Sequence, residues 1–293
     1  MFYVAERGTI MNKCVYKTKK GRGIVETLYK KVLADYSFLT FEQLFIQTEV
    51  ARTHVLRFGE PSKIPLIMIH GSMSNSAVWF GHVSEFIDHF CVYCIDIPGE
   101  PGLSEPVRIP LASEAPNRWL YSLLEILAIE KASFLTMSLG SWYALNFAIS
   151  YPNKNNALSM ITIGGGLMPM KISFIIKVLF SMMLGEVGKK WLYKRVFHKT
   201  EVPSDVSEFQ SIVSKHFNPL IESLPLFQNE QLKKITAPIQ YVGGDHDVIF
   251  DSVKTGARLK NLFPKSEIHI LKDRGHVIID QFDTIKNFLI TNY

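Results

Sequence analysis

The stretch that decides the fold is Phe134-Leu135-Thr136-Met137-Ser138-Leu139-Gly140-Ser141. An apolar run enters a turn of small residues with Ser138 at its tip, and a helix-like segment over 142–149 follows at once. This order of strand, serine, glycine and helix is typical of a nucleophile elbow, in which a sharp turn exposes the hydroxyl beside the free N–H groups of a helix start. The usual pattern is G-x-S-x-G, and Thr136 stands where its first glycine belongs. The segment predicts Ser138 as a nucleophile if partners for it exist elsewhere in the chain.

Other short apolar runs also end in polar residues. Runs over 64–69, 91–97, 238–242 and 266–271 have the length and composition of buried strands, and they end at His70-Gly71, at Asp96, at Gly244-Asp245-His246-Asp247 and before Gly275-His276. The carboxyl ends of parallel strands share one edge of a sheet, so residues far apart in sequence meet there. The sequence therefore predicts that a serine, an aspartate and a histidine come together at that edge.

In these motifs and in their order, the chain resembles an α/β-hydrolase, and within that family the bacterial carboxylesterases. The order Ser, then Asp, then His is the order of that family. The resemblance implies an α/β fold: a mostly parallel twisted sheet flanked by helices, with a helical cap inserted after the sixth strand. Two departures stand out. Thr136 replaces a glycine of the elbow, and the segment Asp96-Ile97-Pro98-Gly99-Glu100-Pro101-Gly102-Leu103-Ser104 carries one residue more than the common D-x-x-G-x-G-x-S.

Three parts of the chain are expected. Residues 1–40 form a basic helical lead, residues 41–166 and 235–293 form the core, and residues 167–234 form the helical cap insert. The insert is rich in Met and Phe and is broken by prolines, unlike the strand–helix pattern around it. Within the core and the lead, spacing predicts strands over 44–50, 54–58 and 157–163 and helices over 25–34, 79–90 and 118–128.

The chemistry assigns roles to three side chains. A serine hydroxyl is a poor nucleophile until a base takes its proton, so Ser138 needs His276 within hydrogen-bond reach. The imidazole needs a carboxylate on its other nitrogen, and Asp247 is the fourth residue of the G-x-x-D segment, as the family pattern requires. Asp245 is the alternative, and otherwise a loop carboxylate. Asp273 is expected to shape the turn before His276.

Attack on a carbonyl also needs donors for the oxyanion. By resemblance these are the backbone N–H groups of Leu139, just after the nucleophile, and of Ser72, just after His70-Gly71. Met73 is the alternative to Ser72 if the loop is offset by one residue. His70 is expected to organise its loop and to carry no proton.

The resemblance implies a serine hydrolase that cleaves a carboxylic ester with a small or medium, largely apolar group. An apolar stripe in the insert is expected to supply an adaptable pocket, although ordinary helix core is the alternative for each of its residues: Leu167, Met168, Met170, Phe174, Phe180, Met182 and Met183. Hydrolysis of a carbon–carbon bond or a thioester on the same triad stays open, and so does a non-catalytic ligand-binding role.

Composition excludes several other classes of protein. The 293 residues are 47% hydrophobic and 20% charged, which is enough apolar material for a large core and unlike a disordered chain. The net charge of +5 comes with no aromatic-basic module, so we expect a solvated basic face and no nucleic-acid partner. Contact with an anionic membrane surface is compatible with that charge, but no motif supports it.

Three cysteines are too few for a disulfide framework. Cys91 and Cys94 lie three apart in a strand, so their side chains point to opposite faces and are expected to pack in the core. The other histidines show no ligand spacing, and neither a metal nor a cofactor is predicted. Glu6 and Arg7 interrupt any signal-peptide pattern, and the apolar segment 172–184 is too short to span a bilayer. The sequence predicts a soluble, cytoplasmic protein that acts on a small molecule.

Overall fold

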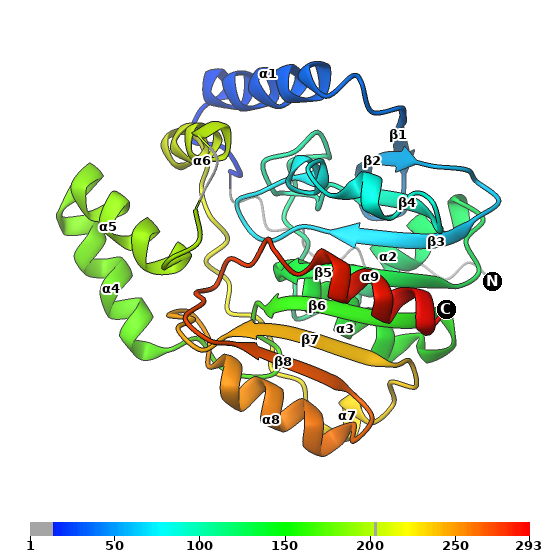
Figure 1. The fold of residues 1–293 in the computed structure, drawn as a ribbon. Helices are drawn as coiled ribbons and strands as arrows, with labels where there is room; N and C mark the ends of the chain where they lie inside the picture. The colour runs from blue at the N-terminus through cyan, green and yellow to red at the C-terminus, as the bar shows by residue number, and fades with distance from the viewer. Residues whose placement is uncertain (1–13, 202–203) are drawn as a thin grey trace, which may run out of the picture.

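A computed structural model describes residues 14–201 and 204–293. Within them, one eight-stranded sheet has the order β1-β2-β4-β3-β5-β6-β7-β8 (Figure 1). The first two strands and the β2–β4 pair are antiparallel, and the other neighbours are parallel. The strands are β1 (Phe41–Gln47), β2 (Arg52–Phe58), β3 (Ile64–Ile69), β4 (Phe90–Ile95), β5 (Ala132–Ser138), β6 (Asn155–Ile163), β7 (Ile239–Gly244) and β8 (Glu267–Leu271).

The central strands are apolar on both faces because helices cover both sides of the sheet. Successive side chains of a strand alternate between faces, and β3 divides accordingly: Ile67 and Ile69 join one core cluster, and Leu66 and Met68 join the other. The first cluster lies under α2 (Ala115–Ile126), α3 (Leu139–Ser150) and α8 (Ser252–Leu262). The second lies under α1 (Lys19–Asp35) and α9 (Phe282–Thr291).

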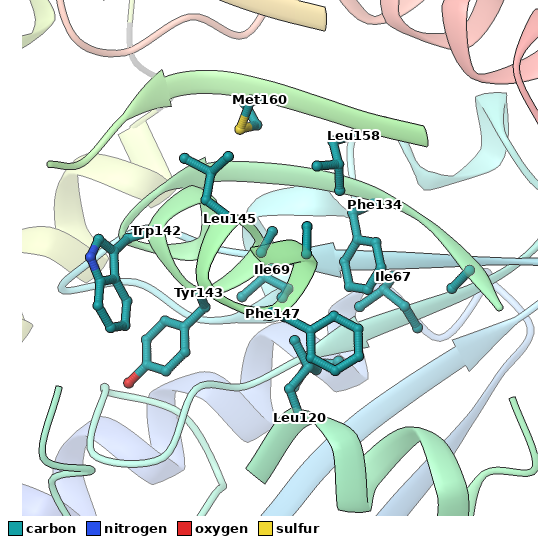
Figure 2. Packing of buried hydrophobic residues seen from close by; sticks show 14 of the residues in the cluster. Ile67, Ile69, Leu120, Phe134, Trp142, Tyr143, Leu145, Phe147, Leu158 and Met160 are labelled. Carbon is teal, nitrogen blue, oxygen red and sulfur yellow. The ribbon is translucent and has the colours of Figure 1, made fainter. Parts of the chain in front are cut away.

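Helix α3, which follows the elbow, is the most deeply embedded part of the first cluster. Its side chains Leu145 and Phe147 pack with Phe134 of β5 and Leu158 of β6 (Figure 2). The rings of Phe134 and Phe147 lie 5.8 Å apart, a favourable separation for an aromatic pair. The chain on both sides of Ser138 is therefore fixed by close packing.

The predicted helix over 79–90 was wrong in type. This segment forms two short 3₁₀ turns, η1 (Ser76–Trp79) and η2 (Val83–Glu85). The N–H groups of Phe80, Glu85 and Phe86 each bond to the carbonyl three residues earlier, which is the 3₁₀ pattern. The buried apolar residues recur here at helical intervals, which explains the prediction. Gly81 in the middle of the segment would destabilise a continuous α-helix by about 1 kcal/mol.

The predicted N-terminal lead contains α1, and this helix packs on the rest of the protein. Val25, Tyr29 and Leu33 are buried, and Val25 packs with Val213 and Phe217 at the end of α6 (Ser204–His216). The first 13 residues of the lead, with Glu6 and Arg7, lie outside the described residues.

After β6 the chain forms α4 (Ile172–Met183), α5 (Gly185–Phe197), α6 and the short α7 (Asn229–Leu232) before it returns to β7. In the described part of the chain, no helix is both long enough and apolar enough to cross a membrane.

Candidate active site

Ser138 occupies a strained turn between β5 and α3. Its φ of +49° lies in a region that non-glycine residues rarely adopt and that is held only by surrounding structure. The Gly140 N–H donates to the His70 carbonyl at 3.1 Å, and the Gly164 N–H donates to the Ser138 carbonyl at 3.0 Å. A Cβ on Gly140 would lie 2.3 Å from the Ile69 carbonyl oxygen, so only glycine fits there. These contacts hold the hydroxyl clear of the backbone.

Thr136 fills the position of the missing elbow glycine without obstructing the turn. Its side chain is fully buried, and its hydroxyl donates to Ser141 Oγ at 3.0 Å. The same hydroxyl lies 3.5 Å from the Ser159 carbonyl on β6. The larger residue is thus accommodated because its polar atom has partners inside the sheet.

The structure brings Ser138, His276 and Asp247 into one chain of hydrogen bonds. The distance from Ser138 Oγ to His276 Nε2 is 2.9 Å, and the distance from His276 Nδ1 to Asp247 Oδ2 is 2.8 Å. A proton on Nδ1, donated to the carboxylate, leaves Nε2 free to accept from the serine hydroxyl. Asp247 and His276 are buried, and Ser138 is half-buried. This geometry can activate the hydroxyl as a nucleophile.

The Asp247 carboxylate is held from several sides. Oδ1 accepts from the Ile249 and Phe250 N–H groups at 2.8 and 3.1 Å, and Oδ2 also accepts from Ser252 Oγ at 3.2 Å. Burial opposes ionisation of Asp247, but His276 and the two backbone donors outweigh it, and its pKa lies below the ordinary value. The carboxylate is therefore charged at neutral pH.

The two other candidate acids lie elsewhere. Asp245 is exposed, and its carboxylate accepts from the Arg274 N–H at 3.4 Å, so it is a loop carboxylate. Asp273 has φ of +61° and forms a surface ion pair with Lys199 at 2.6 Å. Neither carboxylate contacts His276.

The loop after β3 separates the two candidates for the second oxyanion donor. The Met73 N–H donates to Glu100 Oε2 at 2.6 Å, whereas no acceptor for the Ser72 N–H is found among residues 14–201 and 204–293. Leu139 is the first residue of α3, where backbone N–H groups have no partner within the helix. The Met73 amide is therefore already engaged, whereas the Ser72 amide is not engaged by any described residue, and the Leu139 amide stands at the free end of the helix.

Glu100 is a buried residue of the site that sequence reasoning did not single out. It is 2% exposed and forms an ion pair with Arg108 at 2.8 Å in addition to its bond with Met73. Burial raises the pKa of Glu100 despite the nearby guanidinium. Glu100 lies in the segment with one extra residue, and that departure from the common motif was the available signal.

Asp96 and His54 form a second buried pair beneath the site. His54 Nδ1 lies 2.8 Å from Asp96 Oδ2, and both side chains are fully buried. Asp96 also accepts from the Ser76 and Leu103 N–H groups at 2.8 and 2.9 Å. Burial opposes its ionisation, but His54 and the Leu103 N–H hold the pKa of Asp96 well below its usual range. His54 thus anchors the loops around the site.

His70 organises its loop in the expected manner. Its Nε2 accepts from the Ile97 N–H at 3.0 Å, so the ring proton sits on Nδ1, which donates to the Gly71 carbonyl at 2.7 Å. Burial lowers the pKa of His70 and keeps the ring neutral. The loops that follow β3 and β4 are joined through this ring.

Within the described residues, one group has the ligand chemistry for a metal ion. His198, His246 and Asp273 each place a ligand atom within 4.8 Å of the others. The two imidazole rings stack at 4.6 Å, and Lys199 already neutralises the Asp273 carboxylate at 2.6 Å. The arrangement is an ion-pair network between the end of α5 and the loops after β7 and β8. The expectation of no metal stays a prediction.

The expected apolar pocket residues do not all face the site. Met170, Phe180, Met182 and Met183 are between 44% and 83% exposed, so they are not ordinary helix core, and their part in a pocket stays a prediction. A helix shows from its period which residues share a face, but the period does not show whether that face is covered.

A later part of the insert lies over the elbow instead. Phe227 stacks on Trp142 of α3 with ring centroids 5.7 Å apart, and Leu224 contacts Gly165. On the opposite side, the Gln210 side chain of α6 donates to the Met73 carbonyl at 3.1 Å. These contacts connect the later part of the insert to the loops of the site.

Two relatives from Bacillus subtilis (strain 168) are similar over most of the chain. The uncharacterized carboxylesterase nap is 25% identical over 261 residues, which cover 84% of this chain and 84% of that protein. Carboxylesterase YbfK is 22% identical over 247 residues, which cover 81% and 82%.

The fold also matches a solved structure. The crystal structure of naproxen esterase (carboxylesterase NP) from Bacillus subtilis superposes with a TM-score of 0.80 at 22% identity, over 92% of this chain and 97% of that one. This likeness confirms the expected fold. The model of the alpha/beta hydrolase family matches residues 66–284, which include the elbow and all three residues of the hydrogen-bonded chain. The chain therefore belongs to the alpha/beta hydrolase family.

Proposed function

We propose that this chain is a serine hydrolase that cleaves carboxylic esters through an acyl-enzyme. The observation that carries the proposal is the continuous chain of hydrogen bonds from Ser138 through His276 to Asp247, at 2.9 and 2.8 Å. Two relatives that bear the name carboxylesterase support the bond type.

In the first half-reaction, Ser138 Oγ attacks the ester carbonyl while His276 Nε2 takes the hydroxyl proton. The tetrahedral intermediate then collapses, the bond between the carbonyl carbon and the alcohol oxygen breaks, and His276 returns the proton to the leaving alcohol. Asp247 holds the imidazole in the required tautomer and stabilises the transient imidazolium. The acyl group remains on Ser138.

In the second half-reaction, a water molecule attacks the acyl-enzyme with His276 again as base, and the acid leaves as Ser138 recovers its proton. In both halves the Leu139 and Ser72 N–H groups stabilise the oxyanion. Each such donor lowers the barrier by about 3 kcal/mol in a water-excluded site. The positive end of the α3 dipole lies beside the same oxygen and acts in the same direction.

The proposed substrate is an ester with a small or medium, largely apolar acyl or alcohol group. We assign residues 41–166 and 235–293 to the catalytic core and 167–234 to a cap over it. Leu224 and Phe227 in the cap supply apolar surface next to Gly165, Gly166 and Trp142. An apolar wall of this kind favours an apolar substituent through burial of its surface.

The test is hydrolysis of chromogenic acyl esters of graded chain length, with a thioester and a carbon–carbon substrate in parallel because the same triad serves all three. Ser138→Ala should abolish turnover and leave the fold intact. Ser141→Ala is the matched control, since this buried serine lies one turn away in α3 and should keep most activity. Ester turnover by Ser138→Ala near the wild-type rate would contradict the proposal.

A cytoplasmic location stays a prediction; the three free cysteines suit a reducing compartment.

A further inference from the structure

The α4–α5 hairpin carries an apolar face that nothing in the described chain covers. Six of its side chains are between 46% and 83% exposed: Ile172, Ile175, Ile176, Leu179, Met182 and Met183. Their spacing of three and four residues places them on one side of α4. A helix of a globular protein normally turns such a face to the core, and a continuous exposed patch marks an interaction site.

The opposite side of α4 packs on α5, so the apolar face cannot turn inward. Ser181 is buried against Gly188, where a Cβ would lie 2.1 Å from the Ser181 carbonyl oxygen. Phe180 meets Trp191 edge to face, with ring centroids 5.9 Å apart, and the Arg195 guanidinium lies over the same indole, 5.2 Å from the ring centroid. Figure 1 shows the two helices side by side at the margin of the molecule, away from the sheet.

The charge of the hairpin indicates what covers this face. Over 172–197 the basic residues are Lys177, Lys189, Lys190, Lys194 and Arg195, against the single acid Glu186, which gives a net charge of +4. Apolar side chains beside basic ones, with an aromatic ring at the border, match the surface of an anionic lipid bilayer. A second copy of this chain would bring the same positive charge to the interface and be repelled.

We propose that the outward face of the α4–α5 hairpin docks onto an anionic lipid surface. This goes beyond the proposed esterase activity and does not depend on it. Both ends of the hairpin are tied to the loops of the site: the Lys171 side chain donates to the Asp247 carbonyl at 2.6 Å, and the His276 N–H donates to the Val196 carbonyl at 2.9 Å. Docking therefore brings those loops to the lipid surface.

The test is binding of the untagged full-length protein to phosphatidylcholine vesicles with and without phosphatidylserine, measured by flotation. The wild type should float with the vesicles that contain phosphatidylserine, and high salt should weaken this binding. Replacing Ile176, Leu179 and Met183 together by Gln should weaken it about tenfold or more, because three apolar anchors are lost while helix propensity is kept. The matched control places Gln at Phe38, Ile126 and Val253, which lie outside the hairpin and are 52% to 74% exposed.

A charge variant tests the lipid class independently of the apolar anchors. Lys190→Gln and Lys194→Gln should each weaken binding to the anionic vesicles about fivefold, since one basic residue near such a surface contributes about 1 kcal/mol. Circular dichroism and thermal unfolding check that every variant is folded. Equal flotation of wild type and triple variant would overturn the proposal. So would a wild-type dimer that the triple variant dissociates without any vesicle binding, because the face would then be a subunit interface.

Discussion

Gly140→Ala is the sharpest perturbation of the elbow that leaves every reacting group in place. A Cβ at this position would lie 2.3 Å from the Ile69 carbonyl oxygen and 2.7 Å from that of His70. Real Cβ atoms essentially never approach closer than 3.0 Å, and both neighbours are backbone atoms, one at the end of β3 and one at the start of the loop after it. The start of α3 must therefore move by at least 0.7 Å relative to that loop.

This displacement acts on both catalysis and stability. Ser138 directly precedes the start of α3 and Ser72 lies in the loop after β3, so the proposed nucleophile and one proposed oxyanion donor change their relative position. A misplacement of about 1 Å costs about 100-fold in rate, and overpacking of a buried site costs about 1–3 kcal/mol. We expect kcat/KM for an acyl ester to fall about 100-fold in a variant that still folds, with urea unfolding to measure its stability.

The control for this substitution is Gly23→Ala in α1. Apart from the adjoining residues and the backbone of the helix itself, no atom lies within 4 Å of the added methyl group there. Because alanine is the better helix former by about 1 kcal/mol, this variant should be slightly more stable and fully active. Wild-type turnover in Gly140→Ala would refute the reasoning, since the close approach of α3 to the β3 loop would then have no part in placing the nucleophile.

Three further outcomes follow from the buried carboxylates. Asp247→Asn should lower kcat about 10⁴-fold, because the amide favours the wrong imidazole tautomer, whereas Asp245→Asn should have little effect; the opposite ranking would move the triad acid. Glu100→Gln should cost about 3 kcal/mol in urea unfolding, because the Arg108 side chain, only 10% exposed, loses its counter-charge, and a cost near zero would contradict this. Asp96 and Asp247 have lowered pKa values in the folded state, so the unfolded state binds more protons in acid. The free energy of unfolding should therefore fall as pH drops below about 4. Asp96→Asn should reduce the slope of this free energy against pH by up to about 1.4 kcal/mol per pH unit. The same slope in wild type and variant would show that Asp96 is not charged in the folded protein.

The strands and their shared edge could be predicted from the sequence because both have local signals. Buried parallel strands are continuous apolar runs, and the polar residue after each run marks its carboxyl end. That argument placed Ser138, Asp247 and His276 at one edge, and the structure puts them within hydrogen-bond distance. Their catalytic roles stay predictions until they are measured.

What the sequence could not supply depends on contacts between distant segments. The pairing of His54 with Asp96 and of Glu100 with Arg108 joins residues whose neighbours in sequence give no sign of a partner. The apolar stripe of α4 has a clear helical period, yet it faces outward, because a period defines a face and tertiary packing decides what covers it. For the same reason, apolar spacing over 79–90 predicted an α-helix where 3₁₀ turns bury the same side chains.

The central claim is that Ser138 is the nucleophile, and covalent trapping tests it most directly. A fluorophosphonate transfers its phosphonyl group to an activated serine and releases fluoride, and tandem mass spectrometry of the digested protein locates the adduct. The account predicts one adduct per chain, on Ser138, with none in Ser138→Ala and strongly slowed labelling in Asp247→Asn. An adduct on Ser72 or Ser141, or equal labelling of Ser138→Ala, would contradict it.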